Sequence, residues 1–148
     1  MAVKTAFVKQ VSGISLAGKT DSNHWIVMDG PPEFGGSDAG VRPKELLLLA
    51  LGGCTASDVI SILRKKRVAL DDLEIRLSAE QTEDHPQVYT TIHVEYVFRG
   101  VEIRPEDVER AIELSETKYC PVQAMLRPAI TITHSYRIEG VRELQPAG

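Results

Sequence analysis

Two cysteines are the residues of this chain best suited to chemistry. Cys54 follows a pair of glycines inside a long apolar stretch, and Cys120 comes directly before Pro121. Proline favours the first position of a helix, so Cys120 is predicted to be the N-terminal capping residue of a short helix that Pro128 ends. Unpaired backbone N–H groups and the positive end of the helix dipole favour a thiolate at that position. The two residues together indicate thiol redox chemistry.

The surroundings of Cys54 limit what this thiol can do alone. Burial among leucines raises the pKa of a thiol, so a nucleophilic Cys54 needs a cation nearby. Asp58 lies one helical turn later on the same face, where a bare carboxylate would disfavour the thiolate. Two other roles for Asp58 remain open: it holds a lysine or arginine against Cys54, or it is a buried acid satisfied by hydroxyls or by a partner's cation. A purely structural Cys54, as a small residue at a helix crossing, also remains open.

Other catalytic classes have weaker support in the sequence. The four histidines and two cysteines show no ligand spacing, so no metal site and no cofactor are expected. A hydrolase with Cys54 as acyl nucleophile would need a paired histidine, and no recognisable motif supplies one.

The stretch from Arg42 to Arg67 is predicted to be one long helix that positions Cys54. Pro43 suits its first turn, and basic residues end it where the helix dipole favours cations. Its apolar residues cover too much of the circumference for a one-sided stripe, so nearly all faces are expected to be buried, with a partner subunit covering part of them. The pair Gly52-Gly53 predicts that another backbone approaches closely. Asp58 in the apolar stretch disfavours a membrane span.

The remaining segments predict an α+β fold in a single domain, residues 1–148. Three strands are expected near 3–11, 14–17 and 24–28, and then a Gly- and Pro-rich loop, 29–41, which is either a lid over Cys54 or a crossover arm. Period-2 patterns predict a hairpin of strands at 73–79 and 90–98 and a last strand at 129–138. A helix begins at Pro105. The predicted order is βββ-α-ββ-αα-β, with a long buried central helix and an antiparallel sheet.

Composition sets the broad class. The chain has 148 residues, 43% hydrophobic and 26% charged, as in an ordinary soluble globular protein. A net charge of −4 without a basic stripe argues against nucleic acid as a partner. Residues 1–9 contain no apolar signal-peptide region, so a cytoplasmic location is expected, where cysteines stay reduced unless they are redox-active.

With these motifs the chain resembles the OsmC/Ohr family of thiol-dependent hydroperoxide reductases, and more closely its small OsmC-like branch. The resemblance rests on P-K-E-x-L-x-x-A-x-G-G-C at 43–54, on Tyr-Cys-Pro-Val at 119–122 with Ala124 after it, and on the order of the elements. It implies a homodimer of intertwined subunits. Each of its two sites lies at the subunit interface and contains both cysteines of one chain. No metal, haem or flavin is implied.

The resemblance also implies a reaction. Cys54 attacks a hydroperoxide and becomes a sulfenic acid, and Cys120 then condenses with it to a disulfide. An external dithiol, typically a dihydrolipoyl group, reduces that disulfide. Apolar surroundings of Cys54 suit organic hydroperoxides better than hydrogen peroxide, although an inorganic substrate stays in the prediction. The alternative function is a dimeric binding or redox-sensing protein of the same fold with little peroxidase turnover.

The cation that activates Cys54 is where this chain departs from the family. Family members use an arginine from the early strands, held by a glutamate ten positions before the first cysteine. Here that position is Lys44, the acid has moved to Glu45, and Lys19 is the nearest substitute for the arginine. On a straight helix Glu45 and Cys54 point about 180° apart, so Glu45 would serve a site only through a bend or by reaching the partner's cysteine.

Overall fold

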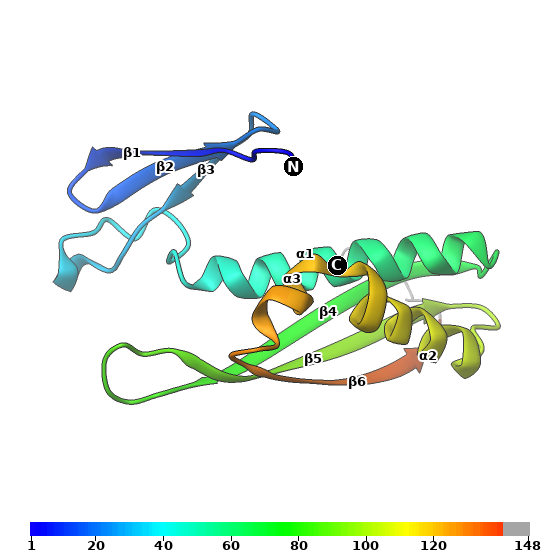
Figure 1. The fold of residues 1–148 in the computed structure, drawn as a ribbon. Coiled ribbons are helices and arrows are strands. Elements are labelled where there is room, and N and C mark those ends of the chain that lie inside the picture. Colours follow the sequence, from blue (N-terminus) through cyan, green and yellow to red (C-terminus); the bar gives the residue numbers. More distant parts are fainter. Residues whose placement is uncertain (141–148) are drawn as a thin grey trace, which may run out of the picture. The chain divides into compact units, whose positions relative to one another are not determined.

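The computed structural model describes residues 1–140 and contains two compact units, Met1–Leu49 and Ala50–Gly148. We call them the first and second unit and describe each by itself. The fold is mixed α+β, as predicted, and has two small sheets and several helices (Figure 1).

The first unit contains the predicted three-stranded antiparallel meander. Its strands are β1 (Ala6–Ser12), β2 (Ser15–Thr20) and β3 (Trp25–Met28), in the order β1-β2-β3. Gly13, in the turn between β1 and β2, has a φ of +56°, which a glycine adopts without strain. The turn and strand patterns of the sequence therefore placed this sheet correctly.

The loop 29–41 is folded around the carboxylate of its first residue. Asp29 accepts a hydrogen bond from the Ser15 hydroxyl at 2.7 Å and further bonds from backbone N–H groups of the loop, those of Gly30, Ser37 and Ala39. The Ser15 hydroxyl first, and then these N–H groups, lower the pKa of Asp29 to about 2 against the opposing effect of burial. A short 3₁₀ turn, η1 (Pro32–Phe34), lies inside the loop. The segment predicted as irregular thus has a defined internal anchor.

The second unit contains the long hairpin and one departure from the predicted topology. β4 (Leu70–Gln81) and β5 (Tyr89–Gly100) pair antiparallel, whereas β6 (Thr131–Glu139) pairs parallel to β5. The prediction of an antiparallel sheet is wrong for this pair. The physical reason is the connection: the helices between β5 and β6 carry the chain back along the sheet, and such a crossover places the next strand parallel.

The long helix α1 (Glu45–Lys65) extends from the end of the first unit through the second. Its buried residues follow a spacing of about four, so one face contacts the rest of the chain: Leu51, Gly52, Thr55, Val59 and Leu63. Ile60, on another face, stays 45% exposed. The expectation that nearly all faces are buried therefore fails for a single chain, because its own sheet and helices cover only one face.

The two glycines of α1 have different surroundings. A Cβ on Gly52 would lie 2.7 Å from Cδ1 of Leu77 on β4, whereas a Cβ on Gly53 would meet no atom within 4 Å. The close approach predicted from this pair is present at Gly52 only, and the neighbour is a leucine side chain of the sheet rather than another backbone.

By length and composition alone, α1 qualifies as a candidate membrane span, as the core helices of soluble proteins also do. The helix is packed along one face in this chain.

The connection from β5 to β6 holds three consecutive helical segments. They are α2 (Pro105–Leu114), a turn of π-helix that we call η2 (Ser115–Tyr119), and α3 (Pro121–Leu126). These segments and the second-unit part of α1 lie on the same face of the β4-β5-β6 sheet (Figure 1). The core between them contains fully buried side chains from α1, β5 and α2, among them Leu51, Val59, Leu63, Ile92, Tyr96, Phe98, Val108 and Ile112.

Candidate active site

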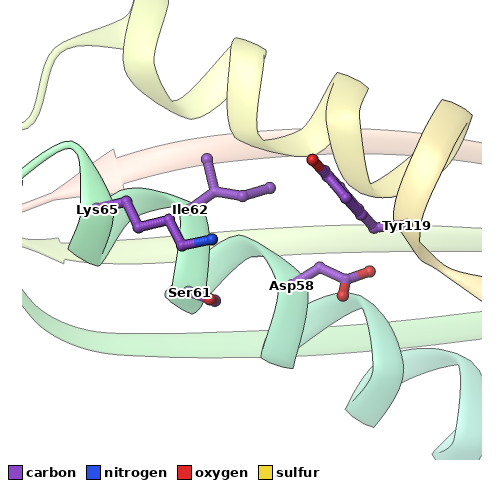
Figure 2. Close-up of a pocket in the computed structure, with 5 residues that line it drawn as sticks. All are labelled: Asp58, Ser61, Ile62, Lys65 and Tyr119. Carbon is purple, nitrogen blue, oxygen red and sulfur yellow. The ribbon is translucent and has the colours of Figure 1, made fainter.

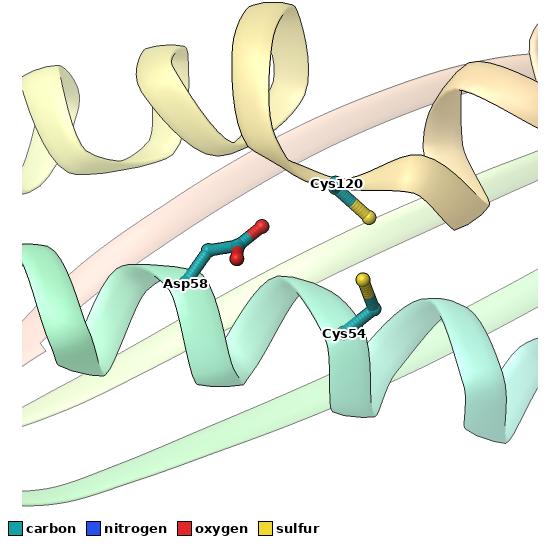
Figure 3. A group of neighbouring side chains, drawn as sticks. All are labelled: Cys54, Asp58 and Cys120. Carbon is teal, nitrogen blue, oxygen red and sulfur yellow. The ribbon is translucent and has the colours of Figure 1, made fainter. Parts of the chain in front are cut away.

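Two thiols and a carboxylate lie together in the second unit. Sγ of Cys54, Sγ of Cys120 and a carboxylate oxygen of Asp58 are all within 4.8 Å of one another. Both cysteines are free thiols, Cys54 partly exposed and Cys120 buried. Figure 3 shows the two sulfur atoms pointing toward each other, from α1 and from the start of α3, with Asp58 one turn along α1.

Cys120 occupies the position that the proline after it predicts. It is the N-terminal cap of α3, and its sulfur accepts a hydrogen bond from the backbone N–H of Gln123 at 3.3 Å. Its own N–H donates to the carbonyl of Ser115 at 2.8 Å, which closes the π-turn η2. π-turns are rare and are frequently found at functional sites. The predicted capping role of Cys120 is confirmed.

Cys54 is held toward Cys120 by α1 and meets the first turn of α3. The backbone N–H of Val122 donates a hydrogen bond to its sulfur, and the Cys54 thiol in turn donates to the sulfur of Cys120. The neighbouring Thr55 hydroxyl donates to the carbonyl of Leu51 at 2.7 Å and lies 3.8 Å from the sulfur of Cys120. Each sulfur therefore has one backbone N–H group and the other cysteine beside it, and the sulfur of Cys120 also has the Thr55 hydroxyl.

These surroundings raise the pKa of Cys54 from its ordinary value of 9.0 to about 11. Burial contributes most, followed by the hydrogen bond with Cys120, and the negative charges of ionised Cys120 and of Asp58 add smaller increases. Only the N–H of Val122 acts in the other direction among these influences. The described part of the second unit thus favours the neutral thiol of Cys54 at neutral pH.

Asp58 is satisfied by a hydroxyl. The hydroxyl of Ser115 donates to Oδ2 of Asp58 at 2.9 Å, and Ser115 is fully buried at the start of η2. Among the ion pairs formed within the described part of the second unit, none includes Asp58. Of the roles considered for Asp58, the hydroxyl-bonded acid is the one observed within this unit, and its charge acts against the Cys54 thiolate.

A small hollow of about 100 Å³ adjoins this cluster. Figure 2 shows the amino group of Lys65 and the carboxylate of Asp58 on the same hollow, whose remaining lining residues are Ser61, Ile62 and Tyr119. Sequence analysis did not single out Lys65. Its position two turns after Asp58 on the same helix face is a signal that could have found it.

Tyr96 of β5 is a further group that the sequence did not identify. Its side chain is fully buried, and its hydroxyl oxygen has no hydrogen-bond partner of good geometry among the described residues. The Thr55 hydroxyl acts on this phenol and lowers its pKa, but that hydroxyl donates its proton to the carbonyl of Leu51. Burial and then the charge of Glu116 raise the pKa of Tyr96, with smaller effects from Cys120 and Asp58. The phenol therefore lies near the thiols with its hydrogen-bonding capacity unused.

The other three candidate residues belong to the first unit and have contacts there. The ammonium of Lys19 donates to Oδ1 of Asn23 at 3.1 Å and lies 5.1 Å from the ring centre of Trp25. The carboxylate of Glu45 accepts the backbone N–H of Arg42 at 3.0 Å, a bond that caps the start of α1. Lys44 directly precedes that helix. A role of these residues at Cys54 stays a prediction.

Comparison with known proteins identifies the relatives of this chain. Residues 35–135 match the sequence model of the family described as OsmC-like protein. Protein YhfA of Escherichia coli K12 is 41% identical over 133 residues, which is 90% of this chain and 96% of YhfA.

Solved structures show the same fold. A hypothetical protein from Aquifex aeolicus is 32% identical, with a TM-score of 0.83 over 96% of this chain and all of that one. An organic hydroperoxide resistance protein from Elizabethkingia anophelis has a TM-score of 0.66 over 93% of this chain and 98% of its own, at 16% identity. At that identity the likeness shows the fold alone.

Proposed function

The chain belongs to the OsmC-like protein family, and on that premise we propose that it is a two-cysteine thiol peroxidase that reduces organic hydroperoxides. The observation that carries this proposal is the facing pair of free thiols, which come from two elements far apart in the sequence and lie within 4.8 Å of each other. On this proposal the two sulfur atoms approach to about 2.05 Å when the disulfide forms.

The chemistry follows from the two positions. The Cys54 thiolate attacks the outer oxygen of ROOH, the O–O bond breaks, and ROH leaves after taking up a proton while Cys54 becomes a sulfenic acid. The Cys120 sulfur then attacks the sulfur of that sulfenic acid, which releases water and forms the disulfide. An external dithiol, dihydrolipoyl or similar, returns both residues to thiols and becomes a disulfide itself. Related proteins named for organic hydroperoxide resistance support the substrate class.

The proposal requires a cation near Cys54, and none of the ion pairs in the described part of the second unit supplies one. On this reading the assembled protein supplies it, either from Lys19 or Lys44 of the first unit or from the partner of a homodimer. A lysine can stabilise a thiolate as a point charge, although it lacks the bidentate geometry of arginine. We place the protein in the cytoplasm, where thiol reductants are available.

A second function is favoured by the raised pKa of Cys54. A thiol that stays neutral at pH 7 reacts slowly with peroxide, which suits a dimeric binding or redox-sensing protein with little turnover. The pH profile of peroxide consumption separates the two functions. A rate that reaches its plateau near neutral pH supports the peroxidase, and a rate that still rises steeply above pH 9 supports the sensor or binding protein.

The direct test of the peroxidase is a stoichiometric pulse of cumene hydroperoxide followed by intact-mass measurement and thiol counting. Wild type is expected to lose both thiols rapidly, Cys120→Ser to stop at a sulfenic acid about 16 Da heavier, and Cys54→Ser to remain unchanged. If wild type keeps both thiols through many equivalents of peroxide, the peroxidase proposal is wrong.

A further inference from the structure

We propose that Cys54, Asp58 and Cys120 of the reduced protein form a binding site for a thiophilic divalent cation such as Zn²⁺. This site uses the same cysteines as the proposed peroxidase but does not depend on peroxide turnover. Binding is not a redox step: the two thiols release their protons, the two sulfur atoms and one carboxylate oxygen each donate an electron pair, and no electron is transferred.

The positions of the donor atoms fit a tetrahedral ion. Zinc binds sulfur at about 2.3 Å and carboxylate oxygen at about 2.0 to 2.2 Å, which places neighbouring tetrahedral ligand atoms about 3.5 to 3.8 Å apart. Here the three donor atoms lie within 4.8 Å of one another. Side-chain shifts of about 1 Å or less would therefore bring all three to ligand distance.

The identity of the donors selects the class of metal. Two thiolate ligands favour Zn²⁺ and similar soft ions over Mg²⁺ or Ca²⁺, which prefer sets of oxygen ligands. Three protein ligands leave the fourth tetrahedral position open, as in zinc sites that keep a water molecule. The unpartnered Tyr96 hydroxyl close to the cluster is a group with which such a water could hydrogen-bond.

The negative charge of the ligands is the second reason to expect a bound cation. The bound form of this cluster would contain two thiolates and a carboxylate, and buried negative charges are strongly unfavourable unless a cation compensates them. No ion pair within the described part of the second unit supplies that cation to Asp58. A divalent ion would neutralise most of this charge at its centre.

Neighbouring groups already hydrogen-bond the three ligand side chains. Ser115 donates to Oδ2 of Asp58 at 2.9 Å and so orients the carboxylate. The backbone N–H groups of Gln123 and Val122 face the sulfur atoms of Cys120 and Cys54. Hydrogen bonds of this kind orient ligands and stabilise their negative charge at metal sites.

Metal binding and disulfide formation exclude each other, because both use the same two sulfur atoms. A bound Zn²⁺ would protect the thiols from oxidation, and the disulfide form would not bind the metal.

The experiment is a titration of the reduced, metal-free protein with Cd²⁺ as a spectroscopic substitute for Zn²⁺, in the absence of peroxide. The ultraviolet absorption of the Cd–thiolate bond is expected to saturate at one ion per chain, and Zn²⁺ is expected to displace the Cd²⁺. Cys54→Ser and Cys120→Ser should each weaken binding by at least about 100-fold, and Asp58→Asn and Ser115→Ala each by about 10-fold or more. Glu113→Gln, which changes an exposed acid that forms an ion pair with Arg110, is the matched control and should bind as wild type does.

Three outcomes would overturn the inference: no saturable band in the reduced wild type, equal affinity of Asp58→Asn and wild type, or equal binding by the disulfide form. Circular dichroism checks that each variant is folded, and Ser115→Ala tests the carboxylate without removing a ligand. Peroxide consumption by the metal-free protein is measured separately. Failure of the metal site therefore leaves the peroxidase proposal standing, and the reverse also holds.

Discussion

At the scale of single residues, Asp58 adds its charge to the burial that limits the reactivity of Cys54. Its carboxylate is fixed by the Ser115 hydroxyl and lies beside both sulfur atoms. A negative charge at this position disfavours the thiolate and adds to the effect of burial. If instead Asp58 holds a lysine from outside the second unit near Cys54, the pair would lower the pKa of Cys54 rather than raise it. Substitution of Asp58 therefore separates the two roles.

We expect Asp58→Asn to increase the rate of alkylation of Cys54 by iodoacetamide at pH 8 by up to about threefold. The reason is that loss of the carboxylate charge lowers the raised pKa of the thiol, and one pKa unit corresponds to about tenfold more thiolate in this pH range. The rate is measured by peptide mass spectrometry on reduced protein in the presence of EDTA, with Glu113→Gln as control. A slower rate in Asp58→Asn would mean that this carboxylate holds a cation against Cys54.

At the scale of elements, α1 and η2 together form the site. α1 contributes Cys54 and Asp58 from successive turns, and it lies tightly on β4 because Gly52 has no side chain where Leu77 packs. The π-turn η2 places Ser115 over Asp58 and ends at Cys120. The separation of the two sulfur atoms therefore depends on how closely α1 approaches the sheet.

Gly52→Ala is expected to destabilise the protein by up to about 2 kcal/mol, because displacing Cδ1 of Leu77, 2.7 Å from the added methyl, costs more than the roughly 1 kcal/mol that alanine gains in helix propensity. Gly53→Ala is the matched control on the next residue. A Cβ at this position meets no atom within 4 Å in this chain, and the higher helix propensity of alanine should stabilise the protein by up to about 1 kcal/mol.

Urea denaturation at a fixed protein concentration measures the free energy of unfolding of wild type and both variants. A Gly52→Ala variant as stable as Gly53→Ala would contradict a tight contact of Leu77 with Gly52.

At the scale of the whole molecule, the exposed apolar surface of each unit points to a partner subunit. The first unit exposes apolar side chains on its small sheet, including Phe7, Val8, Trp25, Ile26 and Val27, and α1 exposes Ile60. Large exposed apolar patches on a soluble protein usually mark interfaces. The exposed faces are therefore consistent with the homodimer that the resemblance implies, which remains a proposal.

Ile60→Glu is expected to weaken that dimer by at least about tenfold, because it places a charge on the exposed apolar face of α1. The measurement is size-exclusion chromatography with light scattering across a dilution series, in which wild type should run at about twice the 16.3 kDa of one chain. Val101→Glu makes the same change at another exposed apolar residue, in the turn after β5, and should leave the mass unchanged. A wild-type protein that runs as a monomer at all concentrations would contradict the dimer.

The sequence by itself determined the local structure and singled out the two thiols that lie together in the second unit. Periodicity and turn residues predicted the order of helices and strands, and the proline after Cys120 predicted its capping position, because these features depend on neighbours in the chain. The tertiary structure alone decided which distant groups meet. The parallel pairing of β6, the contact of Ser115 with Asp58, the hollow with Lys65 and the unpartnered Tyr96 hydroxyl all depend on how the helical crossover packs on the sheet. That packing results from side chains far apart in sequence filling one core, and no local pattern specifies it.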